Sequence, residues 1–92
     1  MSNSKIKLHD KVLSIVFDDV KHCLFSAGTE RKLFITDLRQ SFNGSRNFSF
    51  IKLSNSSPAT LEIASESSRL FCSTKEGLLL IFDISKKDPI MT

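Results

Sequence analysis

Two short stretches decide the fold of this chain: LFITDL, from Leu33 to Leu38, and LLIFDI, from Leu79 to Ile84. Each is a largely apolar run with one aspartate at its fifth position. Apolar runs of four to eight residues between polar breakers are typical of buried β-strands. Because the second stretch begins 46 positions after the first, the chain could hold one structural unit twice.

A shift of 46 residues lays Val12–Arg39 on Pro58–Ser85 without a gap. The aligned window contains six identities, and further pairs keep their apolar character. The identities are Leu24/Leu70, Phe25/Phe71, Glu30/Glu76, Leu33/Leu79, Ile35/Ile81 and Asp37/Asp83. Since apolar positions match along the window and no gap is needed, the sequence predicts an internal repeat.

Each unit reads as short strands separated by polar breakers, which predicts an antiparallel all-β meander. The strands expected in the first unit are Val12–Phe17, Cys23–Ala27, Lys32–Leu38 and, after a loop at Gln40–Asn47, Asn47–Leu53. Those expected in the second unit are Thr60–Ile63, Leu70–Ser73 and Leu78–Ile84, after a loop at Ser54–Pro58. Pieces of further fourth strands are expected within Lys5–Leu8 and Lys86–Thr92.

Composition describes one small intracellular domain. The 92 residues carry a net charge of +3, with bases and acids interleaved, so no nucleic-acid-binding stripe is expected. No apolar run is long enough to span a membrane, and the N-terminus lacks the apolar segment of a signal peptide. Cys23 and Cys72 are therefore expected to be reduced, and the cytoplasm is expected rather than the nucleus.

The repeated unit resembles one blade of a WD40 β-propeller. The segment His9–Val12 is similar to the His-x-x-Val that opens a WD40 repeat, and Leu24–Leu38 and Leu70–Ile84 are similar to the segment that ends in Trp-Asp. The resemblance covers about 75 of the 92 residues. It implies two antiparallel four-stranded blades, about 9–53 and 55–92, in an incomplete propeller that occupies 1–92.

WD40 repeats often carry a hydrogen-bonded set of His, Ser or Thr, Asp and Trp. The positions that correspond to this repeat motif here are His9, Ser26, Glu30, Asp37, Glu76, Phe82 and Asp83. Trp is absent from the chain, and the turn aspartate is replaced by Glu in both units. In the second unit Asn55 replaces His and Cys72 replaces Ser, so the set is expected to be lost there and cohesion to come from apolar packing.

The residues by themselves suggest no catalytic or metal site. His9 fits both a hydrogen bond to its blade and an exposed loop position, and His22 beside Asp18-Asp19 fits a polar turn. Phenylalanines in the predicted strands are expected to fill the core, namely Phe17, Phe25, Phe34, Phe71 and Phe82. The chain is therefore expected not to be an enzyme and to need no cofactor or metal.

Family resemblance implies a non-enzymatic scaffold that presents loops and blade rims to other proteins. The alternative is a segment of a phosphoinositide-linked endosomal or vesicle trafficking protein, since the chain also resembles WD-repeat proteins that carry a FYVE zinc finger. The zinc finger's cysteine pairs are absent here. A basic patch of Arg31, Lys32, Lys86 and Lys87 would then make a weak membrane contact.

Two further alternatives remain open: a small enzyme, for which no constellation of residues stands out, and a β-barrel in which the 46-residue register is chance. Two blades cannot close a ring of the usual four to eight. We therefore expect a fragment, a truncated isoform or part of a larger assembly, completed by further blades or by a self-associated copy.

Overall fold

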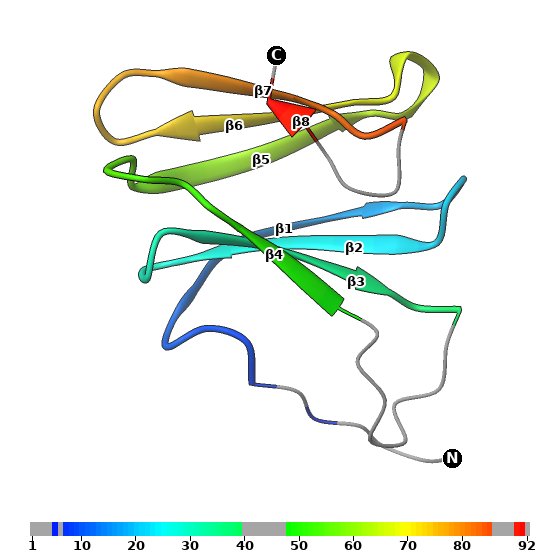
Figure 1. Ribbon diagram of the computed structural model, residues 1–92, viewed down its shortest axis with the longest axis horizontal. Coiled ribbons are helices and arrows are strands. Elements are labelled where there is room, and N and C mark those ends of the chain that lie inside the picture. Colours follow the sequence, from blue (N-terminus) through cyan, green and yellow to red (C-terminus); the bar gives the residue numbers. More distant parts are fainter. Residues whose placement is uncertain (1–4, 6, 40–47, 86–89, 92) are drawn as a thin grey trace.

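The computed structural model consists of two antiparallel β-sheets that lie face to face (Figure 1). It describes residues 5, 7–39, 48–85 and 90–91. The first sheet has the order β1 (Val12–Asp18), β2 (Cys23–Gly28), β3 (Lys32–Asp37) and β4 (Phe48–Lys52). The second has the order β5 (Pro58–Ala64), β6 (Arg69–Thr74), β7 (Leu79–Asp83) and the short β8 (Ile90–Met91). The prediction of an all-β antiparallel fold is confirmed.

Helical structure in the described residues is limited to a 3-10 turn at Ser65–Ser67. Among those residues, no helix is long and apolar enough to cross a membrane. Most expected strands match the observed ones to within one or two residues. The strand expected at Lys5–Leu8 is wrong, because Lys5, Lys7 and Leu8 lie outside any strand. The predicted loop at 40–47 lies outside the described residues.

The 46-residue correspondence extends to the pairing of the strands. In the first sheet Val12 pairs with Gly28, and an irregularity follows before the regular register resumes. In the second sheet Pro58 pairs with Thr74, with the irregularity at the same place. The tight turns repeat as well: N–H of Arg31 donates to O of Gly28, and N–H of Gly77 donates to O of Thr74, both at 3.2 Å.

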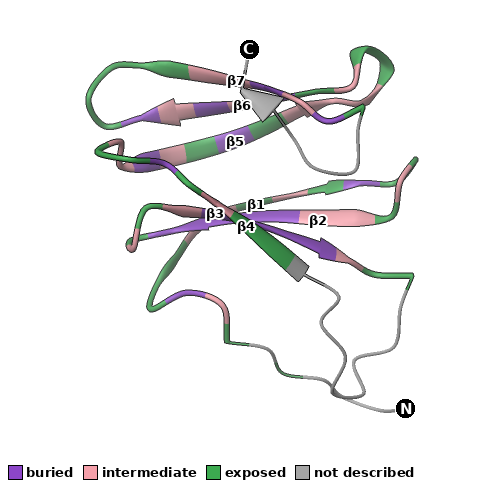
Figure 2. Ribbon diagram, viewed as in Figure 1, coloured by how far each residue is buried: buried purple, intermediate pink, exposed green. Residues whose placement is uncertain are grey.

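The core lies between the two sheets, where β1 and β2 pack against β5. Its buried members are Phe25, Ala27, Leu33, Ile35, Leu53, Leu61, Leu70, Cys72, Phe82 and Ile84. The middle of β3 is buried, as Figure 2 shows, and the outward ring of Phe34 packs against His9 and Phe50. Strand β7 is left open on one face, where Leu79 is 60% exposed.

Strand β1 presents an apolar face to solvent. Side chains alternate along a strand, and Val16 packs into the core while Ser14 hydrogen-bonds across to the second sheet. Ile15 and Phe17 therefore point away from the second sheet, and they are 58% and 46% exposed. The prediction that Phe17 fills the core is wrong for this reason.

Candidate functional site

His9 lies in the segment before β1 and is held by side chains from β2 and the β2–β3 turn. The residue is 6% exposed, and its ring packs edge-on against Phe34, with ring centroids 4.9 Å apart. Nε2 lies 2.9 Å from Oγ of Ser26, and Nδ1 contacts the Glu30 carboxylate. A carboxylate only accepts, so Nδ1 carries a proton, and in the neutral imidazole the Ser26 hydroxyl donates to Nε2. His9 thus forms side-chain hydrogen bonds to the first sheet and its turn, and it is not an exposed loop residue.

Gly28 makes room for this ring, a role that the sequence interpretation did not identify. A Cβ atom at this position would lie 2.4 Å from Nδ1 of His9 and 2.7 Å from Oε1 of Glu30. In the second sheet the corresponding residue is Thr74, and the histidine is replaced by Asn55, which is exposed. The sequence does carry a signal of this packing: in the second unit the histidine and the glycine are both replaced, by Asn55 and Thr74.

Both glutamates of the repeat motif fasten the chain just before a sheet begins. Oε2 of Glu30 accepts the N–H of Asp10 at 3.0 Å, and Oε1 of Glu76 accepts the N–H of Ser57 at 2.9 Å. Burial raises the pKa of Glu30, but the hydrogen bonds from His9 and Asp10 outweigh it and lower the pKa below its usual value. The Ser57 hydrogen bond lowers the pKa of Glu76.

Cys72 stands at the place of Ser26 in the repeat, and its buried thiol packs into the core. The second sheet therefore lacks both the imidazole and the hydroxyl of the set, and it keeps the glutamate. Phe82, at the place of Trp in the repeat motif, is 1% exposed and is also part of the core.

The motif aspartates end their strands. Asp37 is the last residue of β3 and Asp83 is the last residue of β7, each one position before the strand end expected from the sequence, at Leu38 and Ile84. In each case Oδ1 accepts, at 2.9 Å, the N–H of the residue two positions later, Arg39 or Ser85. Such a turn satisfies a backbone donor as the chain leaves the sheet.

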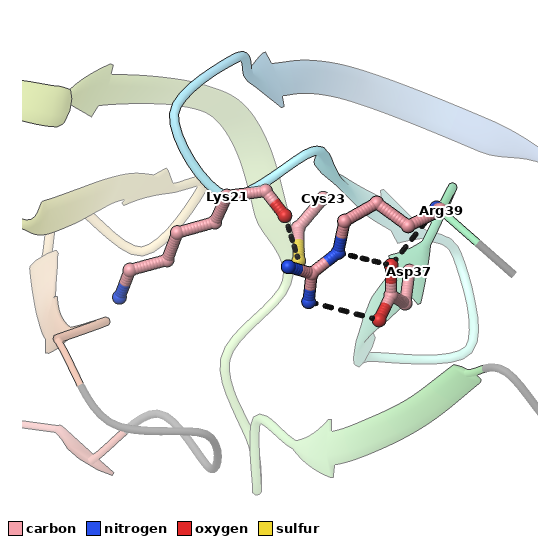
Figure 3. A network of polar contacts seen from close by, with 4 residues as sticks. All are labelled: Lys21, Cys23, Asp37 and Arg39. Atoms are coloured by element: carbon pink, nitrogen blue, oxygen red, sulfur yellow. Dashed lines mark hydrogen bonds and ion pairs between the residues drawn. The ribbon is translucent and has the colours of Figure 1, made fainter.

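The end of β3 carries a small polar network with Cys23 beside it (Figure 3). Arg39 places Nε and Nη2 each 3.3 Å from the two carboxylate oxygens of Asp37, and these hydrogen bonds lower the pKa of Asp37. The thiol of Cys23 donates to the Lys21 carbonyl at 3.6 Å. Burial and the nearby Asp37 raise the pKa of Cys23, so this thiol lacks the thiolate character of a nucleophile.

Asp18 and Ser14 link the two sheets, which the sequence interpretation missed. Asp18 was expected in a polar turn, but it is the last residue of β1 and is 2% exposed. Its Oδ1 accepts the N–H of Val20 at 3.0 Å and the hydroxyl of Ser65 at 3.4 Å. Oγ of Ser14 accepts the N–H of Leu61 at 3.0 Å. His22 is exposed in the following turn, as expected.

A hollow of about 150 Å³ opens where β4 and the connection after it meet β7. Its walls are apolar and its edge is polar. The lining residues are Ile51, Lys52, Leu53, Ser54, Ser56, Leu80 and Phe82. The volume is suited to one apolar side chain, and Ser54 and Ser56 in the lining supply hydroxyls that could contact a peptide backbone.

Among the described residues, no group of three or more His, Cys, Asp or Glu side chains is placed to hold a metal ion. The hydrogen bonds around His9 hold the segment before β1 against the first sheet. The hollow has a geometry suited to binding. No family model, curated protein or solved structure matches this chain.

Proposed function

We propose that this chain is a non-enzymatic scaffold module of the WD40 kind that binds other proteins. The observation that carries the proposal is the hollow between β4 and β7, with its apolar walls and polar edge. Protein interfaces draw most of their binding energy from a few anchoring side chains that fill such pockets. A partner would insert one large apolar side chain beside Leu80 and Phe82 and contact the rim at Ser54 and Ser56.

The WD40 assignment is part of this proposal and draws on the sheets. Each has four antiparallel strands in chain order, the register repeats at 46 residues, and the sheets stack face to face. The contacts of His9 with Ser26 and Glu30 are those that the resemblance implies for a first unit. A partner-binding role follows from that resemblance and from the hollow together, and no catalytic role is proposed.

A peptide library displayed on phage and selected on the purified chain tests the role. Selected peptides are expected to share one large apolar residue. Ser56→Trp fills the hollow and is expected to weaken their binding about tenfold or more, which is about 1.4 kcal/mol. Asn55→Trp adds the same side chain at an exposed neighbour outside the hollow, and it is expected to leave binding unchanged. Peptides that bind Ser56→Trp as well as the natural chain would contradict the proposal.

The phosphoinositide alternative draws on less. Of its four bases, Lys86 and Lys87 lie outside the described residues. Nζ of Lys32 lies over the Phe50 ring, 4.7 Å from its centroid, which leaves Arg31 as the exposed base of the described pair. One base near an anionic membrane is worth about 1 kcal/mol. We therefore favour a protein partner; sedimentation with liposomes that contain phosphoinositides would reveal a lipid role.

A further inference from the structure

Large apolar side chains are exposed at eight described positions, and five of these correspond to residues that pack in the interior. The correspondence is the 46-residue shift that relates the two sheets. The pairs, exposed residue first, are Val12/Pro58, Ile15/Leu61, Phe17/Ile63, Leu38/Ile84 and Leu79/Leu33. The exposed residues are thus not scattered over the surface. They repeat the contact that already holds the two sheets together.

That contact is head-to-tail. The first sheet contributes the face that includes Leu33. The second sheet contributes the face that includes Leu61, which by the 46-residue shift corresponds to the other face of the first sheet. The faces left open are therefore the complementary pair. We call the open face of the first sheet the leading face (Ile15, Phe17 and Leu24) and the open face of the second sheet the trailing face (Phe71 and Leu79).

We propose that the trailing face of one copy of this chain seats the leading face of a second copy, through the same contact that joins the two sheets within the chain. The occupant is a second copy because its leading face carries the residue types that the first sheet already accepts. Ile15 would take the place of Leu61, and Leu79 would take the place of Leu33, which is fully buried. A head-to-tail contact of this kind continues from copy to copy until the rotation closes a ring.

The polar link across the sheets repeats as well. Within the chain, Oγ of Ser14 accepts the N–H of Leu61 at 3.0 Å. The residue that corresponds to Ser14 on the second sheet is Thr60, whose hydroxyl is exposed and lies 2.6 Å from Oγ of Ser73. A hydroxyl has two acceptor lone pairs, so Thr60 can accept the N–H of Ile15 from the second copy.

Some positions do not fit as well as the contact within the chain: Phe34, which corresponds to Leu80, is already packed against His9 and Phe50. Glu62 is exposed on the trailing face and corresponds to Val16, which packs against the core. Seating a carboxylate where an apolar side chain belongs costs free energy. The contact between copies should therefore be weaker than the internal one, and Glu62→Val should tighten it by about tenfold or more.

Analytical ultracentrifugation over a concentration series tests the proposal. The natural chain is expected to self-associate, and Ile15→Lys and Leu79→Lys are each expected to sediment as monomers of 10.3 kDa. A mixture of the two variants is expected to form dimers, because the intact trailing face of Ile15→Lys meets the intact leading face of Leu79→Lys. Val20→Lys, at an exposed turn position whose counterpart Glu66 is also exposed, is the control and should associate like the natural chain.

Recovery of dimers when the two variants are mixed distinguishes this head-to-tail contact from a symmetric one, in which both copies use the same face. If Leu79→Lys by itself still forms dimers, or if mixing restores nothing, the head-to-tail contact is overturned. A natural chain and a Glu62→Val variant that both stay monomeric overturn it too. A second measurement does not rely on the loss of self-association. A disulfide between Ile15→Cys on one copy and Thr60→Cys on another should form in a mixture of the two variants and not in either variant alone. These faces lie apart from the Ser56 hollow, so the two proposals fail separately.

Discussion

His9 and Gly28 act as one unit, because the imidazole occupies the space that a side chain at position 28 would need. The ring reaches Ser26 and Glu30 only because Gly28 has no Cβ. In the second sheet, which has no such histidine, Thr74 stands at the position that corresponds to Gly28. Its Oγ1 accepts the N–H of Leu78 at 3.0 Å and so stabilises the following turn. A repeat can therefore lose its histidine without losing the turn.

Gly28→Ala is expected to destabilise the chain by about 1–3 kcal/mol, because the new methyl group overpacks against the His9 ring. In a His9→Ala background the clash with the ring disappears, and what remains close is the carboxylate of Glu30, 2.7 Å from the new methyl group at the end of a flexible side chain, so the same substitution is expected to cost less. Urea denaturation of the four proteins in this cycle measures the coupling. Equal costs in the two backgrounds would show that His9 is not the obstacle.

Glu30 should make folding stability depend on pH in the acid range. Its pKa in the folded chain lies below the usual value of 4.5, so the folded state favours the carboxylate. Its contribution is fully present above about pH 4.5 and is lost as pH falls through the folded pKa. The stability gap between the natural chain and Glu30→Gln should therefore be present at pH 6 and shrink as pH falls below 4.5 and through the folded pKa. A gap that stays constant would mean that the carboxylate charge is not what His9 and Asp10 stabilise.

Aspartate ends three strands, β1, β3 and β7, and it plays the same local part in each. The carboxylates of Asp18, Asp37 and Asp83 all accept the N–H two residues later. The last two lie within one residue of the strand ends expected from the sequence, because each closes an apolar run whose register repeats, but the hydrogen bonds were not predicted. Asp18 was assigned to a turn because a second aspartate and a lysine follow it, and that polar cluster hid the end of β1.

Asp18→Ala is expected to cost about 1–3 kcal/mol of folding stability, because the buried carboxylate accepts hydrogen bonds from both Val20 and Ser65. Asp18→Asn keeps an acceptor oxygen and should cost less. Asp19→Ala is the matched control: Asp19 is exposed, and its removal should change stability by less than about 0.5 kcal/mol. Thermal or urea denaturation compares the three. An equal effect at both aspartates would argue against the link between the sheets.

Strand positions could be predicted from local pattern, whereas coverage of the strands could not. The matched apolar runs placed β3 and β7 to within two residues, since strand periodicity is a property of the segment itself. Whether Phe17 or Leu79 is buried depends on what stacks against its sheet. The sequence of one repeat unit contains no information about which sheet packs on it. The hollow was missed for the same reason, because Ile51 and Leu80 come from different sheets and meet only after stacking.

Cohesion of the whole molecule rests on the apolar contact between the sheets, and Cys72 reports on it. Its side chain is fully buried in that contact, and burial raises the pKa of its thiol. A thiol reagent can therefore reach Cys72 only when the sheets separate or the chain unfolds. In a Cys23→Ser background the labelling rate then measures the free energy of that opening.

Leu61→Ala is expected to destabilise the chain by about 2–5 kcal/mol, because Leu61 is 4% exposed in the core between the sheets. Labelling of Cys72 should accelerate about tenfold for each 1.4 kcal/mol lost. Ile84→Val, a milder change in the same core, should cost about 0.5–1.5 kcal/mol and accelerate labelling less. Leu78→Ala removes the same atoms as Leu61→Ala from a side chain that is 54% exposed, and it should leave the rate nearly unchanged. If Leu61→Ala lowered stability without accelerating the labelling of Cys72, the stacked sheets would not be the element that protects this thiol.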